Sequence, residues 1–241
     1  MTRIARPVNA ELTNSLLARA LFGRACIDCP EDVLDRVFAA STLRNYETGE
    51  YVVRRNMESA NFQLVVSGEL ESSVTYASGH RHLFGFLRQG DSSGVAFLVS
   101  GGKHLFDHIA RVNTTLLLTP NSALLKEMQG QPALCLSLLR QLSTRTEVKY
   151  AQVTLDPSVP LATRLAWAIQ TLGRLHGHRR GDSIVLDMKL SQSDIADWLG
   201  VSRQHLNPHL KQLEKNGVIS LGRASLIILD RSFRAYGTAA E

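Results

Sequence analysis

The sequence predicts an α+β protein in which an antiparallel β domain, a long helix and a smaller helical domain follow one another. Glycines separate short apolar runs between residues 46 and 118, and a heptad-like apolar pattern follows Pro132. Two short amphipathic helices with a glycine between them lie near the C-terminus. A chain of 241 residues is comfortable as two domains. We expect the segments 1–120, 121–157 and 158–241.

Composition and charge narrow the class of protein. At 44% hydrophobic and 20% charged residues, the chain can bury an ordinary core. No apolar run approaches the roughly 18 residues of a membrane span. With no hydrophobic signal segment and only three cysteines, a cytoplasmic protein without a membrane partner is expected. From Ser158 onward, 11 Lys and Arg face 7 Asp and Glu, which favours a nucleic acid partner.

The first half of the chain begins with helical spacing and continues with strands. Apolar residues predict a helix from Leu12 to Arg24, and Pro30 followed by acids predicts a second short helix. From Tyr46 to Leu118, glycines recur between runs such as Phe62–Val66. This texture is typical of an antiparallel sandwich or barrel.

A long helix is expected from Pro132 to Val153, with apolar positions that alternate spacings of three and four. One interpretation places this helix on its own sheet. We favour a two-fold dimer helix, because Leu138 and Leu142 make a second face apolar as well. The candidate dimer residues are Leu136, Leu139, Leu142, Thr146, Tyr150 and Val153.

The last third opens after a double proline break at 156–160, which is the natural domain boundary. A helix is expected over Leu161–Leu175, followed by a loop and the strand Ser183–Leu186. Next, Ser191 and Asp194 resemble a capping box, so a further helix begins there.

Two short helices in this region predict a helix-turn-helix with a wing. Gly200 ends the first helix in the left-handed conformation of a tight turn, and Ser202 caps the second. The core stripe of the second helix is Leu206, Leu210 and Leu213. Two apolar runs, 218–221 and 226–229, flank Arg223 as a wing hairpin.

The exposed side of the second helix carries side chains suited to DNA. Arg fits a guanine edge and Gln an adenine edge in the major groove, whereas Lys, Ser hydroxyls and helix N-termini fit phosphates. The alternative is a helical hairpin with no DNA role. The candidate DNA-binding residues are Ser191, Gln192, Ser202, Arg203, Gln204, His205, Asn207, Lys211 and Arg223.

The whole arrangement resembles the Crp–Fnr family of bacterial transcription regulators. Val201-Ser-Arg-Gln204 matches the entry of the family's recognition helix, and the glycines of Tyr46-x-x-Gly-Glu50, Leu64–Gly68 and Gly90-Asp-x-x-Gly94 match its roll. The resemblance covers nearly the full chain. It implies an N-terminal antiparallel β-roll (a double-stranded β-helix) like a cyclic-nucleotide-binding domain, a long dimerisation helix and a C-terminal winged helix-turn-helix.

By position, the resemblance implies that Arg203 and Gln204 read bases and that Ser191, Gln192 and Arg223 lie on the backbone. It implies a homodimer on double-stranded DNA with a pseudo-palindromic operator, and RNA polymerase as a possible further partner. This chain departs from the family at Pro208, where members usually carry Arg or a polar residue. The proline could kink the helix or delay its start.

A second departure concerns cyclic AMP. Family members that bind it place Glu after the last glycine of Gly-Asp-x-x-Gly, and an Arg-Ser or Arg-Thr pair about ten residues later. Here Val95 follows Gly94, and no such pair lies between Lys103 and Arg111. Since Val accepts no hydrogen bond and Asp107 would repel a phosphate, we expect an effector other than cyclic AMP, or none.

Several effectors remain open from the sequence. Cys26 and Cys29 could form a thiol redox switch, but a [4Fe–4S] cluster usually takes four thiolates and Cys135 is the only other cysteine. Two histidine pairs could ligate haem iron or another metal: His80 with His82, and His104 with His108. A small organic effector is an equal candidate, lined by Phe84, Phe86, Val95, Phe97 and Phe106.

Two other classes of function compete with DNA binding. A cupin-like metal enzyme could begin its site with His80-Arg-His82, but no acid occurs before Asp91 and no other catalytic motif is present, so an enzyme is not expected. An adaptor whose winged helix binds protein is compatible with the modest net charge of +5.

Overall fold

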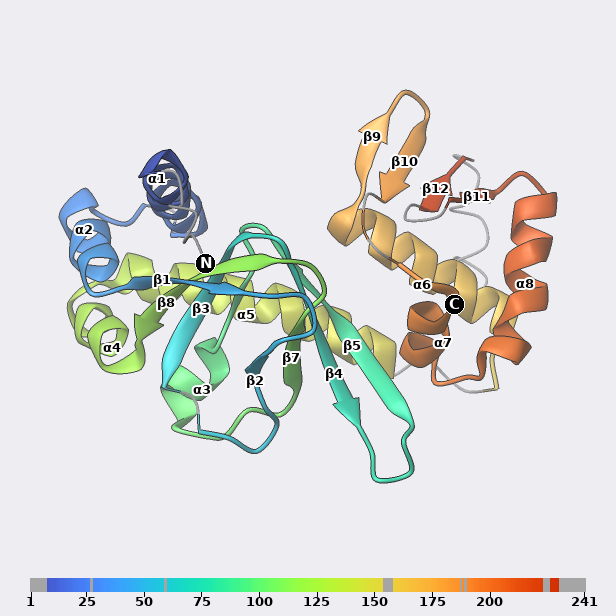
Figure 1. Ribbon diagram of the computed structural model, residues 1–241, viewed down its shortest axis with the longest axis horizontal. Helices are drawn as coiled ribbons and strands as arrows, with labels where there is room; N and C mark the ends of the chain where they lie inside the picture. The colour runs from blue at the N-terminus through green and yellow to red at the C-terminus, as the bar shows by residue number, and fades with distance from the viewer. Residues whose placement is uncertain are drawn as a thin grey trace, which may run out of the picture. The chain divides into compact units, whose positions relative to one another are not determined.

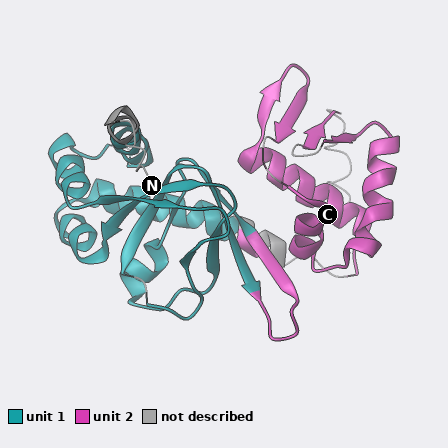
Figure 2. Cartoon of the chain, in the orientation of Figure 1, with its two compact units in different colours: residues 1–74, 85–147 teal, residues 75–84, 148–241 magenta. Residues whose placement is uncertain are grey.

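The computed structural model describes residues 8–26, 28–58, 60–153, 158–186, 188, 190–222 and 226–229. The chain forms two compact units (Figure 2). Unit 1 comprises residues 1–74 and 85–147, and unit 2 comprises residues 75–84 and 148–241. Among the described helices, none combines the length and the apolar character that crossing a bilayer requires.

Unit 1 is built around a roll of two four-stranded sheets (Figure 1), whose recorded pairings are antiparallel. In the first sheet the order is β1 (Thr42–Tyr46), β8 (Thr114–Pro120), β3 (Asn61–Ser67) and β6 (Ser92–Ser93). In the second sheet it is β2 (Tyr51–Val53), β7 (Asp107–Ala110), β4 (Glu69–Thr75) and β5 (Arg81–Arg88). The expected antiparallel roll is therefore confirmed.

Five helices accompany the roll: α1 (Val8–Ala25), α2 (Glu31–Ala39), α3 (Val95–Ser100), α4 (Asn121–Gly130) and α5 (Pro132–Val153). The helix expected over Leu12–Arg24 is α1, and α2 begins directly after Pro30 as expected. In Figure 1, α1, α2 and α4 gather beside the end of the roll that β1 and β8 form. The long helix has the expected bounds, Pro132 to Val153.

Alternation along β3 gives unit 1 two cores. Phe62, Leu64 and Val66 pack against the helices, together with residues of α1, α2, α4 and α5. Val65, on the opposite face of the strand, packs inside the roll with residues of the second sheet. Because successive side chains of a strand point to opposite faces, Gln63 shares the inner face with Val65. A buried glutamine inside the roll requires a polar neighbour.

Unit 2 contains α6 (Leu161–His176), α7 (Gln192–Leu199), α8 (Arg203–Lys215) and a four-stranded antiparallel sheet. Its strand order is β11 (Ile219–Leu221), β12 (Leu226–Ile228), β10 (Ser183–Leu186) and β9 (His178–Arg180). The apolar stripe expected on α6, formed by Leu161, Leu165, Ile169 and Leu172, is buried. Residues 75–84, between the main parts of β4 and β5, also belong to this unit.

Candidate nucleic-acid interface and sensor cavity

The first helix of the helix-turn-helix, α7, begins with a complete capping box. The Ser191 hydroxyl accepts a hydrogen bond from the Asp194 amide at 3.1 Å, and the Asp194 carboxylate accepts one from the Ser191 amide at 2.8 Å. Two amides that the helix itself leaves without partners are thereby satisfied. The predicted start of α7 is confirmed.

The turn between the two helices depends on Gly200. Its backbone is left-handed, with φ 67° and ψ 33°, a conformation that glycine adopts without steric cost. The Val201 amide then donates back to the Ala196 carbonyl at 3.0 Å. Ser202 caps α8 by accepting from the His205 amide at 3.2 Å. The short turn thus places the start of α8 directly after the end of α7.

The α8 helix buries one face and exposes the other. Leu206, Leu210 and Leu213 are buried as expected. The remaining faces carry Arg203, Gln204, His205 and Lys211, all exposed, whereas Asn207 is half-buried. Pro208 lies inside the helix, which nevertheless begins at Arg203 and extends to Lys215. The structure therefore shows neither a late start nor a break at the proline.

The wing follows α8 and is anchored to it. β11 and β12 pair antiparallel, with Leu221 opposite Leu226. The Glu214 carboxylate of α8 accepts a hydrogen bond from the Leu221 amide at 3.0 Å. Arg223, the candidate residue at the wing tip, lies outside the described residues. Ser191 and Ser202 are exposed and Gln192 is half-buried at the starts of their helices.

An ion pair in unit 2 was missed by the sequence reasoning. Arg81, in the β4–β5 hairpin segment, lies 2.6 Å from the Asp194 carboxylate and 2.8 Å from that of Asp197. Asp194 is buried, so this one carboxylate joins a capping box and an ion pair. No local sequence signal could reveal the pair, because 113 residues separate Arg81 from Asp194.

In unit 1, the positions that would read cyclic AMP are occupied by other contacts. Gly94 has φ 98°, and a Cβ there would meet the Asn61 carbonyl at 3.1 Å. Val95 is buried in the core that faces the helices. The Asp107 carboxylate accepts from the Arg55 amide at 2.8 Å, and Arg111 pairs with Glu69 and Glu71 at 3.2 Å each.

The candidate effector residues make separate contacts, and their common role in binding an effector stays a prediction. Phe84 belongs to the hairpin segment of unit 2. Phe86 is buried with the Arg111 guanidinium 5.0 Å from its ring centre, and Phe97 contacts His104 edge-on at 4.9 Å. Val95 belongs to the helix-facing core, and Phe106 is half-buried.

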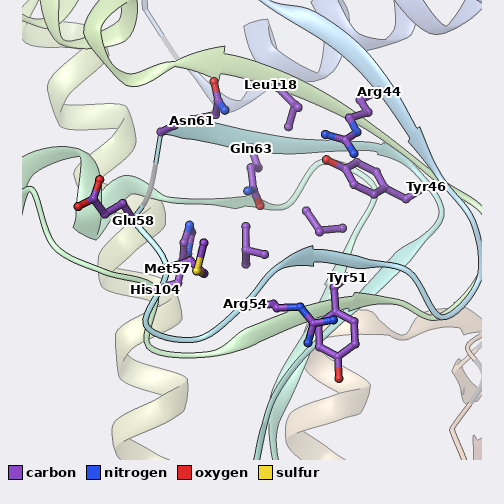
Figure 3. A pocket seen from close by; sticks show the side chains of 13 residues that line it. Arg44, Tyr46, Tyr51, Arg54, Met57, Glu58, Asn61, Gln63, His104 and Leu118 are labelled. Carbon is purple, nitrogen blue, oxygen red and sulfur yellow. The ribbon is translucent and has the colours of Figure 1, made fainter.

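A cavity of about 310 Å³ opens instead between β1, β2, β3 and β8 (Figure 3). Its apolar walls include Val52, Val53 and Leu118. Its polar groups include Gln63 and His104, which are only 5% and 3% exposed. Burial lowers the pKa of His104, so its imidazole is neutral at pH 7. Arg44 and Arg54 also line the cavity.

The candidate cysteines and the histidines His80 and His82 contact other side chains of the protein. Cys26 is buried in the core and burial raises its pKa to about 12, so it remains a thiol at neutral pH. Burial also raises the pKa of Cys29. His80 stacks on Tyr76 and His82 tilts against Phe84. Within the described ranges, no group of three or more His, Cys, Asp or Glu could hold a metal ion.

The long helix α5 exposes apolar side chains on one face and packs against the core of unit 1 with another. Leu136, Leu139 and Tyr150 are 48%, 54% and 67% exposed. Leu138 lies in the core of unit 1 and Leu142 packs against it, so Leu142 belongs to the inward face. Gln141 accepts from the Ser92 hydroxyl, and the Arg145 guanidinium donates to the Ser92 carbonyl. Thr146 is half-buried, and the Val153 side chain lies outside the described residues.

Sequence comparison finds two domain families in this chain. The profile of the cyclic nucleotide-binding domain matches residues 43–131, and that of the Crp-like helix-turn-helix domain matches residues 163–232. The anaerobic regulatory protein of Bacillus subtilis (strain 168) is 23% identical over 204 residues, which is 83% of this chain and 84% of that protein. The nitrogen fixation regulation protein FixK of Bradyrhizobium diazoefficiens is 24% identical, over 86% of this chain and 91% of that protein.

Solved structures share the fold. That of FixK2 from Bradyrhizobium japonicum covers 83% of this chain and 99% of its own, with 21% identity and a TM-score of 0.73. A CooA mutant from Carboxydothermus hydrogenoformans covers 92% of this chain and 95% of its own, with 18% identity and a TM-score of 0.72. With a cyclic-nucleotide-type roll before a capped, winged helix-turn-helix, the chain belongs to the Crp–Fnr family of DNA-binding transcription regulators.

Proposed function

We propose that the chain acts in the cytoplasm as a homodimer that binds a pseudo-palindromic operator through α8. The observation that carries this proposal is the exposed face of α8, where Arg203 and Gln204 occupy the first turn of a capped helix. The N-terminal residues of a recognition helix approach base edges in the major groove. The exposed Leu136 and Leu139 on α5 supply the seam for a second copy.

In such a dimer each α8 enters one of two major grooves about 34 Å apart, one helical turn of DNA. Arg203 donates two hydrogen bonds to a guanine, a contact that contributes roughly 1–3 kcal/mol of discrimination. Lys211, two turns further along, lies near the phosphate backbone instead. The regulator responds to an effector other than cyclic AMP or to none, and RNA polymerase is a further partner for a regulator of this kind.

The experiment selects the preferred operator from random duplexes and then measures binding by fluorescence anisotropy at several salt concentrations. Arg203→Ala should weaken operator binding and relax the preference at one base pair of each half-site. Lys211→Ala, the matched control, should weaken all sequences about equally and lower the salt slope by about one unit. If Arg203→Ala keeps its selectivity while Gln204→Ala loses it, the proposed register of α8 is wrong.

A salt series also separates this proposal from the adaptor alternative. DNA binding that neutralises phosphates must weaken steeply as salt rises, because counterions are released. A chain that binds protein through its winged helix would show no selected operator and no such slope.

A further inference from the structure

The second turn of α8 exposes a proline. Asn207 and His209 are half-buried and Leu210 is buried, so that Pro208 is the one exposed residue of this turn. The buried Leu206 and Leu210 lie two positions before and after the proline. At 3.6 residues per turn, Pro208 therefore points about 160° away from each of these leucines. Its ring is the outermost group of the second turn.

Polar side chains flank this proline along the exposed face of α8. Gln204 lies one turn before Pro208 and Lys211 nearly one turn after it, and both are exposed. In the proposed function this face enters the major groove, so an apolar ring lies between a side chain suited to base edges and one suited to phosphates. Four helical residues advance about 6 Å, which is roughly two base pairs of DNA. Pro208 is therefore expected within about two base pairs of the position that Gln204 contacts.

Helix formation does not explain why a proline occupies this position. Proline lacks the amide that would donate to the Gln204 carbonyl, and its ring crowds that carbonyl. It is the least favourable residue in the interior of a helix, although α8 extends from Arg203 to Lys215 around it. A residue that breaks a local rule of this kind is characteristic of functional sites. The ring is also exposed rather than part of the buried leucine stripe, so it is available to an external partner.

We propose that Pro208 selects a thymine in each half-site by contact with its C5-methyl group. This inference rests on the proposed function, because it requires α8 in the major groove. Among the four bases, thymine alone presents a methyl group there, beside its O4 acceptor. The proline ring offers no donor or acceptor to the other base edges, and its contact with the methyl group removes apolar surface of both from water. Pro208 thus determines specificity at one base pair without a hydrogen bond.

Uracil tests the methyl group alone, because its base differs from thymine only in lacking that group. The operator selected by the full-length protein is remade with each thymine replaced in turn by uracil, symmetrically in both half-sites. At one thymine position, fluorescence anisotropy should show binding weakened about fourfold per half-site, the effect of one buried methyl group, and so roughly 15-fold in the duplex. In a duplex with C·G at that position, 5-methylcytosine should bind more tightly than cytosine.

Variants of α8 assign the methyl effect to one side chain. Pro208→Ala should bind the thymine and uracil duplexes nearly equally at this position, while thymines elsewhere in the operator keep their effects. Pro208→Arg should move the preference at the same base pair to G·C, because Arg donates two hydrogen bonds to guanine. Lys215→Ala, an exposed position in the last turn of α8, is the matched control and should leave the pattern of uracil effects unchanged.

Two outcomes overturn this inference while the proposed function stands. In the first, an operator is bound but none of its thymine methyl groups contributes to affinity. In the second, the thymine that contributes keeps its full effect in Pro208→Ala. If no operator is selected at all, the proposed function fails and this inference fails with it, so the two failures are distinguishable.

Discussion

Polar residues in the helix-turn-helix and polar residues in the roll interior differ in what they bind. In α7 and α8, Ser191 and Ser202 each hydrogen-bond an amide three residues ahead. In the roll, Gln63, Ser93 and His104 come from three separate segments, and no described residue hydrogen-bonds the His104 side chain. The first set stabilises its own backbone. The second set makes contacts between separate segments of the roll, such as the Ser93–Gln63 hydrogen bond between β6 and β3.

The dimer seam of α5 gives the largest expected effect, because it decides whether two helix-turn-helix units act together. Leu136→Glu with Leu139→Glu should place four carboxylates in the seam and yield monomers in sedimentation. Operator affinity should fall by about 100-fold or more, since the second half-site no longer benefits from a high effective concentration. Lys126→Glu with Gln129→Glu, at exposed positions of α4, is the control. An unchanged dimer would contradict the assignment of α5.

Asp194→Ala should be the most destabilising change in the helix-turn-helix. It removes the capping box and one of the two carboxylates that pair with Arg81, with an expected loss of about 2 kcal/mol of unfolding free energy. Both tryptophans of the chain, Trp167 and Trp198, lie in α6 and α7, so their fluorescence in urea reports on this unit. Asp182→Ala, in an exposed turn, is the control. A shift no larger than that of the control would show that the cap is dispensable.

His104→Leu should raise the free energy of unfolding, whereas Asp194→Ala should lower it. Replacing an unpartnered buried imidazole with an apolar side chain should stabilise the ligand-free roll by about 1 kcal/mol. Hydrogen exchange of the β3 amides measures this change. A destabilisation as large as that of Asp194→Ala would mean that His104 supports the fold and would blur the distinction between the two regions.

Cyclic AMP should have no effect at all on unit 1. Calorimetry with millimolar cyclic AMP should show no saturable heat, because Val95 is buried in the core and the carboxylates of Glu69 and Glu71 bind Arg111. A dissociation constant in the micromolar range would contradict this prediction and would mean that the roll binds cyclic AMP.

The sequence predicts well the features that depend on neighbouring residues. It predicts poorly the features that depend on residues far apart in the chain. The capping box, the left-handed Gly200 and the stripe of α8 are visible because each depends on residues within four positions. The β texture of the roll is equally visible. Its strand order is not, because β3 pairs with β8 some fifty residues later. The cavity combines Arg44, Gln63, His104 and Leu118, and no sequence spacing links them.

Two features of the roll depend on tertiary pairing rather than on residue type. The aromatic residues Phe84, Phe86, Phe97 and Phe106 are predicted effector residues by type, and the sheet register sets which groups they contact, such as Arg111 beside Phe86 and His104 beside Phe97. The apolar run 95–99, within the β-rich half, forms most of the α3 helix between the left-handed Gly94 and Gly101. Type and spacing identify what a residue can do, and the tertiary pairing decides whether it does so.

The ion pair between Arg81 and Asp194 limits where the chain can be cut to make fragments or chimeras. The chain passes between the two units at residues 74/75, 84/85 and 147/148, so a fragment that begins after Pro157 lacks the hairpin residues of unit 2. Such a fragment would retain the buried Asp194 carboxylate and lose the Arg81 guanidinium that lies 2.6 Å from it. In chimeras that exchange the sensor half between related regulators, the hairpin should therefore stay with the helices it contacts. A chimera that replaces Arg81 should therefore replace Asp194 as well, although 113 residues separate the two.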